Sequence, residues 1–465
     1  MWLYRHLPTV AGLAARLFYR LTTAGEKAPA AGPALLVANH PGALMDPVLV
    51  AAVAGRPVRF LAKAPLFDDW RTAWAVRGAG AVPVHRRQDD PGAASRNREM
   101  FAAVETALAE GAAVALFPEG VSHDAPALAP LRTGAARIAL GAAVRLGQPI
   151  PIHPVGLVFR EKETFRSGAL AVIGAPVAWD DLAGRGPENA EAVHELTRRI
   201  DGALRAVTLN LARWEDAELV ECAEAVWAVE YDAASEPAAR LTRLRATSEL
   251  LARGRAANAA LLPPLVRAVR RHAKMLRHLG LAPADLHVAL DGRTALRWTL
   301  RRLPLLALPL LALAAAGLAL WWPPYRLVGS LAQAARPSRD VHATYKFGAG
   351  LAVFTLWVVL LSVLAAATWG ALAAVGVLLG LPLSGLAALA VVERWEAAWL
   401  DARRFFLLRS NPDLLRRLRH DQRELAERLD AYLRQHDPSA APHSATAFAG
   451  RASQQKHIDP LTVDG

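Results

Sequence analysis

The residues with the clearest chemical potential lie in one stretch, residues 34–53, ALLVANHPGALMDPVLVAAV. His40 follows a short apolar run, and Asp46 comes six positions later. A neutral imidazole can take a proton from an alcohol near neutral pH and return it later in a reaction. A carboxylate bonded to the same ring fixes its tautomer and stabilises the imidazolium ion. His40 and Asp46 could therefore act together as a general base for a substrate hydroxyl group.

More charged side chains follow other apolar runs in the same way. Glu119 stands in FPEGVS, Lys63 ends VRFLAK, and Arg86 and Arg87 end GAVPVHRR. Arg132 precedes a helical pattern. A guanidinium group offers a planar fork of donors that suits a phosphate group. If these residues converge with His40, they predict a site for an alcohol that carries a phosphate.

The elements that would position these residues alternate along the chain. Short apolar runs predict strands at residues 34–38, 58–63, 80–84, 112–120, 149–159 and 170–177. Between them, helical patterns occupy residues 46–55, 95–111 and 133–147. This alternation predicts an α/β domain over about residues 25–185, with a mainly parallel sheet flanked by helices. The turn residues after position 38 would leave His40 at the carboxyl edge of the sheet, where such proteins bind ligands.

Residues 34–177 resemble the glycerophospholipid acyltransferase family, typified by 1-acylglycerol-3-phosphate acyltransferases. Four motifs of that family occur here in the expected order: Asn39-His40 with Asp46, Gly80 to Arg86, Phe117 to Ser122, and Ile150-Pro151-Ile152. One departure is that five residues, rather than the usual four, separate His40 from Asp46. A bulge in the Pro-Gly turn could absorb the extra residue.

A branch of the family near the glycerol-3-phosphate and dihydroxyacetone-phosphate acyltransferases is also similar. The chain shares with that branch an Asn-His-Pro start and a long hydrophobic C-terminal region. The segment DVHATYKFGAGLAVFTLWVVLL, residues 340–361, is similar to that branch as well. The resemblance therefore does not separate the possible acceptors.

The resemblance implies an O-acyltransferase of phospholipid biosynthesis. The acyl group would move from a thioester, acyl-CoA or acyl carrier protein, to a hydroxyl of glycerol phosphate, lysophosphatidic acid or another lysophospholipid. No cofactor or metal beyond that co-substrate is expected. His40 would be the base and Asp46 would orient it. The residues expected to bind substrate are Arg86, as the first choice for the phosphate, its neighbours Lys63, Arg87 and Arg132, and Glu119 and Gly120, which would shape the glycerol site.

Several alternatives stay open at this point. The acceptor could be glycerol 3-phosphate itself or another lipid alcohol. The chain could also be a non-catalytic lipid-binding membrane protein that keeps the fold, a reading favoured by the altered His–Asp spacing. Among single residues, Glu119 could be a structural carboxylate that caps the next loop, and Arg86 and Arg87 could be a solvated surface pair.

Outside the predicted catalytic domain, the chain divides by composition. Residues 1–24 have apolar positions at helical spacing with arginines between them, which suits a helix on a membrane surface or one packed on its own domain. Residues 186–300 are predicted to be helical. Residues 301–392 contain three uncharged runs, 303–322, 347–369 and 370–392, each long enough for a bilayer span. Residues 393–436 predict a charged amphipathic helix or a pair of such helices, broken near Asn411-Pro412, and the polar tail 437–465 predicts disorder.

Charge and composition predict a membrane location. The 465-residue chain is 53% hydrophobic with a formal net charge of +12, and arginines flank the apolar runs. By the positive-inside bias these flanks are cytoplasmic, so residues 347–392 could form a two-helix hairpin. We expect the active site on the cytoplasmic face of a membrane, such as a bacterial inner membrane, with phospholipid as the partner.

Composition also excludes some classes of protein. The single cysteine, Cys222, leaves no internal disulfide framework and no cysteine metal cluster. The histidines show no spacing typical of metal ligands. A nucleic-acid partner is disfavoured because the basic residues flank apolar runs rather than forming one stripe with aromatic residues.

Overall fold

The structure, a computed structural model, describes residues 4–85, 93–288, 308–336 and 339–436. The chain divides into two compact units. The first comprises Met1–Ala212, Glu236–Arg245 and Arg336–Phe347, and the second comprises the rest. Arg86, Arg87, residues 303–307 of the first apolar run and the tail 437–465 lie outside the described residues.

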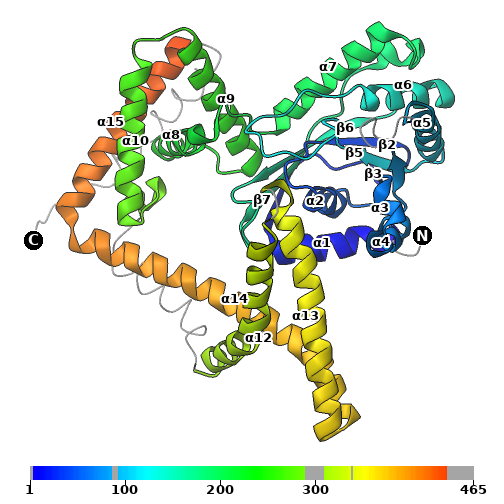
Figure 1. Ribbon diagram of the computed structural model, residues 1–465. Coiled ribbons are helices and arrows are strands. Elements are labelled where there is room, and N and C mark those ends of the chain that lie inside the picture. The colour runs from blue at the N-terminus through cyan, green and yellow to red at the C-terminus, as the bar shows by residue number, and fades with distance from the viewer. Residues whose placement is uncertain (1–3, 86–92, 289–307, 337–338, 437–465) are drawn as a thin grey trace, which may run out of the picture. The chain divides into compact units, whose positions relative to one another are not determined.

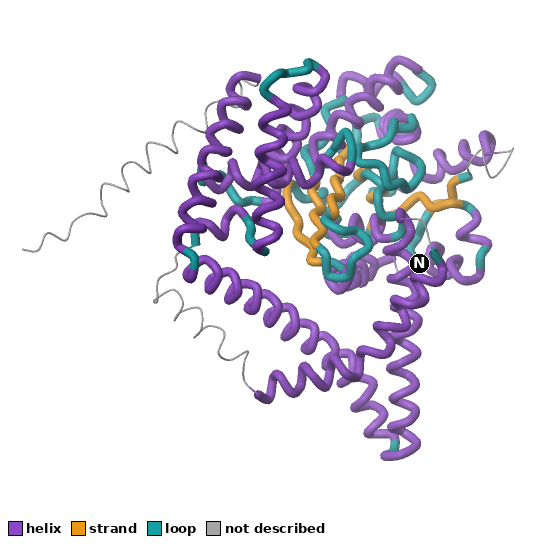
Figure 2. Tube along the Cα trace, turned by 60° about the vertical axis from the view of Figure 1, so that its left-hand side comes forward, coloured by secondary structure: helices purple, strands orange, loops and turns teal. Residues whose placement is uncertain are grey.

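The first unit contains a seven-stranded sheet with the strand order β1-β7-β6-β2-β5-β3-β4 (Figures 1 and 2). Neighbouring strands are parallel except for the β6–β7 pair, which is antiparallel. The prediction of a mainly parallel sheet flanked by helices is confirmed. The strands are β1 Arg20–Gly25, β2 Ala34–Ala38, β3 Val58–Lys63, β4 Val82–Val84, β5 Ala113–Leu116, β6 Ile152–Phe159 and β7 Gly168–Ile173.

The central strand β2 is buried on both faces, and its side chains alternate between two cores. Leu35 and Val37 belong to the core with α5, α6 and α7, whereas Leu36 belongs to the core with α1 and α2. Helices therefore cover both faces of the sheet (Figure 1). The helices of this unit are α1 Leu7–Phe18, α2 Met45–Val53, α3 Pro65–Asp68, α4 Trp70–Gly78, α5 Ala93–Ala109, α6 Gly134–Leu146 and α7 Ala190–Val207, with short 3-10 helices η1 Tyr4–His6 and η2 Asp180–Arg185.

The N-terminal segment differs from the expectation in one respect. Strand β1 pairs in parallel with β7, so the sheet begins at Arg20, inside the segment 1–24 expected to be a surface helix. Its sequence, RLTTAG, has no apolar alternation because most of its side chains are exposed at the sheet edge. Helix α1 buries Ala15 and Phe18 against the core but leaves Leu13 and Leu17 exposed. The helix thus packs on its own domain and still presents an apolar outer face.

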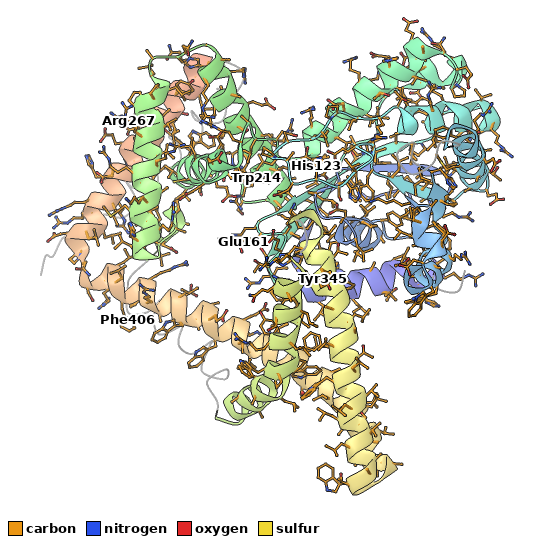
Figure 3. All side chains as sticks on the ribbon, in the orientation of Figure 1. His123, Glu161, Trp214, Arg267, Tyr345 and Phe406 are labelled. Atoms are coloured by element: carbon orange, nitrogen blue, oxygen red, sulfur yellow. The ribbon has the colours of Figure 1, made fainter. Side chains whose placement is uncertain are left out.

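The second unit is helical in the described residues. Leucines of α10, α14 and α15 share one core, with Leu276, Leu408 and Leu415 among its members. The side chains of Arg267 and Phe406 project outward from their helices (Figure 3). The elements are α8 Ala217–Glu230, α10 Leu262–Leu279, α12 Leu308–Ala335, α14 Ala371–Ser410, α15 Pro412–His436, η3 Trp214–Asp216 and η4 Pro283–His287, and α9 Pro237–Ala256 and α13 Arg339–Trp369 begin in the first unit and end in this one.

Two described helical segments are long and apolar enough to cross a membrane, Val341–Trp369 and Ala371–Ser410. Most of their residues are not buried within the protein. Gly370, with φ of 87°, separates the two helices, at the position expected for the turn of a hairpin. Asn411 separates α14 from α15, where a break between charged helices was expected.

Candidate active site

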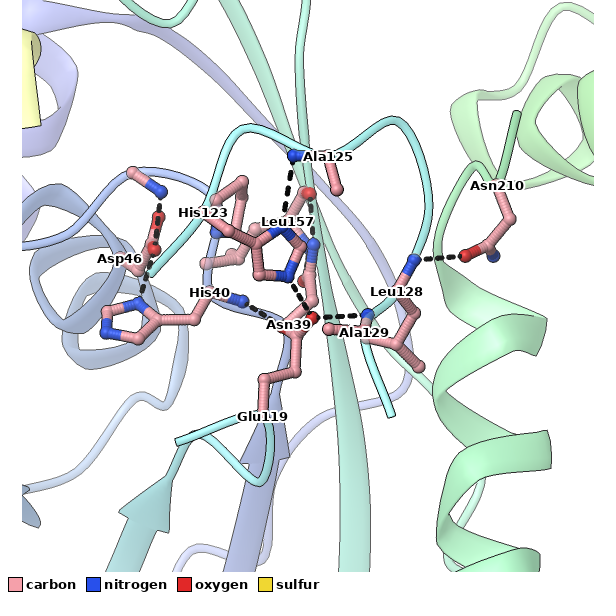
Figure 4. A network of polar contacts seen from close by, with 12 residues as sticks. Asn39, His40, Asp46, Glu119, His123, Ala125, Leu128, Ala129, Leu157 and Asn210 are labelled. Atoms are coloured by element: carbon pink, nitrogen blue, oxygen red, sulfur yellow. Dashed lines mark hydrogen bonds and ion pairs between the residues drawn. The ribbon is translucent and has the colours of Figure 1, made fainter. Parts of the chain in front are cut away.

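His40 and Asp46 are in direct contact at the carboxyl edge of the sheet (Figure 4). His40 stands two residues after the end of β2, and Asp46 lies in the first turn of α2. The Nδ1 atom of His40 lies 2.7 Å from Oδ2 of Asp46. A carboxylate only accepts hydrogen bonds, so Nδ1 carries the proton and Nε2 has its lone pair available. The His40 side chain is 17% exposed, and no partner for Nε2 is found among the described residues.

The loop between the two residues accommodates the extra position. Ala43 adopts the left-handed conformation, with φ of 48°, which is unusual for a residue with a side chain. The N–H group of Gly42 donates to Asp46 Oδ2 over 2.7 Å. A Cβ atom on Gly42 would lie 2.8 Å from Asp46 Oδ1, so any larger residue here would force the carboxylate or the loop to shift. The five-residue spacing therefore leaves the His–Asp contact intact.

Asp46 is completely buried, which has an electrostatic consequence. Burial raises the pKa of the Asp46 carboxyl group, because a charge loses its hydration inside the protein. The hydrogen bond from His40, the Gly42 N–H group and the positive charge of Lys162 act in the opposite direction. Atom Oδ1 has no hydrogen-bond partner among the described residues. Such a carboxylate costs stability, and this is the pattern seen at functional sites.

Two further contacts fix the position of His40, one made by its neighbour Asn39 and one made to its ring. Asn39 bonds to the backbone of β6 at Leu157, with its Nδ2 donating to the carbonyl over 3.0 Å and its Oδ1 accepting from the N–H over 2.7 Å. This pair extends the β2–β6 ladder by one residue through a side chain. The ring of Phe117, which follows β5, stacks on the His40 ring with centroids 4.1 Å apart. The sheet itself therefore sets the direction of the imidazole.

Glu119 is buried, and both its oxygens are used within the protein. Oε1 accepts from the backbone N–H of His40 over 2.7 Å, and Oε2 accepts from the N–H of Ala129 over 2.7 Å and from the ring of His123. Because Nδ1 of His123 accepts from the N–H of Ala125, its proton lies on Nε2 and is donated to Glu119. Glu119 thus links the loop after β5 to the backbone of His40 (Figure 4).

Lys162 contributes to the site, although the sequence analysis did not single it out. Its Nζ donates to the carbonyl of Pro41 over 2.8 Å and pairs with Asp124 at 2.6 Å. The backbone carbonyl of Lys162 accepts from the hydroxyl of the buried Tyr19, whose pKa is raised by burial and by the charge of Asp46. The only signal in the sequence is a charged run, REKETFR, directly after β6.

Of the four cations predicted to bind phosphate, two lie among the described residues, Lys63 and Arg132. Lys63 ends β3 at the same sheet edge and is exposed. Arg132 is exposed and packs across Gly120, where a Cβ atom would lie 2.6 Å from its Nε. Gly120 has φ of 76°, and its N–H group donates to the carbonyl of Phe117. Arg86 and Arg87 lie outside the described residues.

The sheet topology brings several of these positions to one edge. Strands β2, β5, β3 and β4 are adjacent and parallel, so their carboxyl ends meet there. The residues that follow those ends include His40, Glu119 and Lys63. Within the described part of the chain, no group of three or more histidine, cysteine or acidic side chains could hold a metal ion. The arrangement can accept a proton at Nε2 of His40 beside cationic side chains.

Comparisons with known proteins find similarity to acyltransferases. Residues 20–158 match the family model described as Acyltransferase. The chain is 32% identical over 134 residues to glycerol-3-phosphate O-acyltransferase 2 of Saccharomyces cerevisiae, a match that covers 28% of this chain and 18% of that protein. Glycerol-3-phosphate O-acyltransferase 1 of the same yeast is 34% identical over 119 residues, or 24% of this chain and 16% of that protein. The chain thus spans less than a fifth of the length of these curated relatives.

A solved structure is also similar. It is the 1-acyl-sn-glycerophosphate (LPA) acyltransferase PlsC from Thermotoga maritima, with a TM-score of 0.32 and 21% identity over 43% of this chain and 78% of that chain. The match to the family model covers β1 through most of β6, including His40, Asp46 and Glu119. Residues 20–158 therefore match an acyltransferase domain, and the predicted resemblance of this region to the glycerophospholipid acyltransferase family is confirmed.

Proposed function

We propose that this protein transfers a fatty acyl group from a thioester, acyl-CoA or acyl carrier protein, to a hydroxyl group of glycerol phosphate or a lysophospholipid. The observation that carries the proposal is the 2.7 Å contact between His40 Nδ1 and Asp46 Oδ2, which leaves Nε2 available at a partly exposed sheet edge. The match of residues 20–158 to the Acyltransferase family model supports the same reaction class. The contact also removes the reason for favouring a non-catalytic protein, which was the altered spacing.

In this proposal the proton moves through His40. Nε2 accepts the proton of the substrate hydroxyl while the hydroxyl oxygen attacks the carbonyl carbon of the thioester. Asp46 holds the ring and stabilises the imidazolium ion that forms. The tetrahedral intermediate then collapses, the carbon–sulfur bond breaks, and the departing thiolate takes the proton from Nε2. The products are an ester and a free thiol, and no residue of the protein is acylated.

The substrate groups would be held by the cations at the sheet edge. Arg86 is the first choice for the phosphate, with Lys63, Arg87 and Arg132 beside it, because guanidinium and ammonium groups form charge-assisted bonds to phosphate. Glu119 and Gly120 would shape the glycerol site through the loop that they hold. The oxyanion of the intermediate would need N–H donors, which backbone groups of the His40 turn can supply.

A lysophospholipid acceptor would come from the membrane. Acyl chains partition into lipid, and the two apolar helices, Val341–Trp369 and Ala371–Ser410, together with the net charge of +12, favour attachment to an anionic bilayer. We place the active site at the cytoplasmic surface, on the side of the basic flanks.

The test is a substrate panel. Purified full-length protein in phospholipid vesicles is given labelled acyl-CoA or acyl carrier protein thioester with glycerol 3-phosphate, dihydroxyacetone phosphate, lysophosphatidic acid or other lysophospholipids. The proposal expects thiol release that depends on one of the acceptors and an acylated product of matching mass. Absence of acceptor-dependent release with every pair would overturn it and favour a lipid-binding role.

A further inference from the structure

The first turns of helix α13 belong to the catalytic unit, although they lie far outside the matched acyltransferase domain. Residues Arg336–Phe347 are grouped with the sheet, whereas the family model ends at residue 158. Ala343 is buried in the core formed by α1, α2 and β2, and Phe347 packs against the same core. The ring of Phe347 lies edge-on to that of Phe18 in α1, with centroids 6.2 Å apart. This segment is therefore fixed to the domain by apolar packing.

One polar contact joins the segment to the catalytic loop. The N–H group of Leu44 donates to the Oγ1 atom of Thr344 over 3.0 Å. Leu44 lies between the left-handed Ala43 and Asp46, in the loop that brings Asp46 onto His40. The left-handed conformation is unfavourable for alanine, so contacts from outside the loop help to hold it. Thr344 supplies such a contact.

A second set of contacts connects the segment to the loop through residues 162 and 163. His342 Nδ1 lies 2.9 Å from Oε2 of Glu163, and Nζ of Lys346 donates to the carbonyl of Glu163 over 2.9 Å. The neighbouring Lys162 donates to the carbonyl of Pro41. Figure 3 labels Tyr345 and Glu161, which mark the two segments that these contacts join. Residues 340–347 thus hold the catalytic loop directly at Leu44 and indirectly at Pro41.

We propose that residues 340–347 form a brace that positions the His40–Asp46 pair, with Thr344 as a positioning residue for the transfer reaction. The role of the brace in turnover rests on the proposed function. The brace is the start of α13, so the helix that continues as a candidate membrane span also supports the catalytic loop. A displacement of about 1 Å at a catalytic group can reduce turnover as much as a hundredfold.

The test compares two substitutions at one position. Thr344→Val removes the oxygen but keeps the shape, whereas Thr344→Ser keeps the oxygen. We expect Thr344→Val to lower kcat about tenfold with KM for both substrates changed by less than about twofold, because the loop and not the binding site is disturbed. Thr344→Ser should restore kcat to within about twofold of the wild type. The matched control is Thr368→Val, since Thr368 lies in the same helix and its hydroxyl, among the described residues, donates to the carbonyl of Leu364 in that helix.

Hydrogen exchange gives a readout that does not depend on activity. The peptide that contains Leu44 should exchange faster in Thr344→Val than in the wild type, in Thr344→Ser or in the Thr368→Val control. Wild-type exchange and wild-type kcat in Thr344→Val would overturn the brace, as would a loss of kcat that Thr344→Ser does not recover. If the wild type shows no acyl transfer, the proposed function fails, and the exchange experiment still decides whether Thr344 holds the loop.

Discussion

At the scale of single residues, the neighbours of His40 determine which of its atoms is available to a substrate. Asp46 takes Nδ1, Phe117 covers one ring face, and Glu119 holds the backbone N–H, which leaves Nε2 for a substrate. His40, Phe117 and Glu119 could be placed at this edge from the sequence because each follows a buried strand, whereas Asp46, in the first turn of α2, was predicted from its spacing to His40. The left-handed conformation of Ala43, which accommodates the extra residue between His40 and Asp46, was not predictable. No pattern in NHPGALMD favours that conformation at alanine. The role of Glu119 depends on Ala129 and His123, which only the folded loop brings together.

Asp46→Asn should separate activity from stability. An amide cannot stabilise the imidazolium ion, so we expect kcat to fall at least about a hundredfold. The folded state raises the pKa of Asp46 above its ordinary value of 3.8 and so binds more protons than the unfolded state. The contribution of Asp46 to the free energy of unfolding of the wild type is therefore present below pH 3.8. It is lost as the pH rises through the pKa of Asp46 in the folded state. The free energy of unfolding of the variant, relative to the wild type, should rise over that window.

Denaturation curves of both proteins from pH 3.5 to 8, with steady-state rates at neutral pH, would measure both effects. A variant with near-normal kcat would remove Asp46 from the mechanism. A stability difference that falls with rising pH would contradict its burial as a costly carboxylate.

At the scale of elements, the sheet was predictable where strands are buried and apolar. Residues 34–38 and 58–63 are strands with the predicted bounds. A short run of apolar side chains with turn residues on each side is typical of a buried strand. Strand β1 was missed because its exposed side chains leave no periodicity. Lys162 was missed because its partners, Pro41 and Asp124, are distant in the sequence. Contacts of this kind arise only from the strand order.

Close packing of β6 on α7 gives a prediction at this scale. A Cβ atom on Gly156 would lie 1.8 Å from the backbone oxygen of Val207, so Gly156→Ala must push the end of α7 from the sheet. Overpacking of this kind costs roughly 1–3 kcal/mol or more, so we expect a lower unfolding midpoint. The control is Gly168→Ala on β7, where the nearest atom is 3.9 Å away. Equal midpoints for the two variants in thermal denaturation would contradict the close approach.

At the scale of the whole molecule, the chain joins a catalytic unit to helices with exposed apolar surfaces. Leu356 on α13 and Leu379 on α14 are more than 60% exposed, as are several neighbours in the same helices. Water is a poor solvent for such surfaces, and lipid is a suitable one. The hairpin was predictable because uncharged runs of this length stand out in any sequence. The attachment of residues 340–347 to the catalytic loop was not predictable, because Thr344 and Glu163 carry no hydropathy signal.

Charges placed in the two helices test this assignment. Arginine near the centre of a span costs about 2.5–3.5 kcal/mol, so the double substitution Leu356→Arg and Leu379→Arg should reduce the fraction of protein that floats with phospholipid vesicles. Leu261→Arg is the control, because Leu261 is an exposed leucine outside both candidate spans. If the double variant floats like the wild type, these helices do not hold the protein in the bilayer.

The most direct measurement is single-turnover transfer by His40→Ala, with circular dichroism to show that the variant is folded. The ring is at the surface of the sheet edge and its backbone N–H is held by Glu119, so the fold should survive its removal. General-base catalysis accounts for about 10²–10⁴-fold in rate, and we predict a loss of at least that size. A folded His40→Ala protein that transfers acyl groups at the wild-type rate would contradict the assignment of His40 as the base.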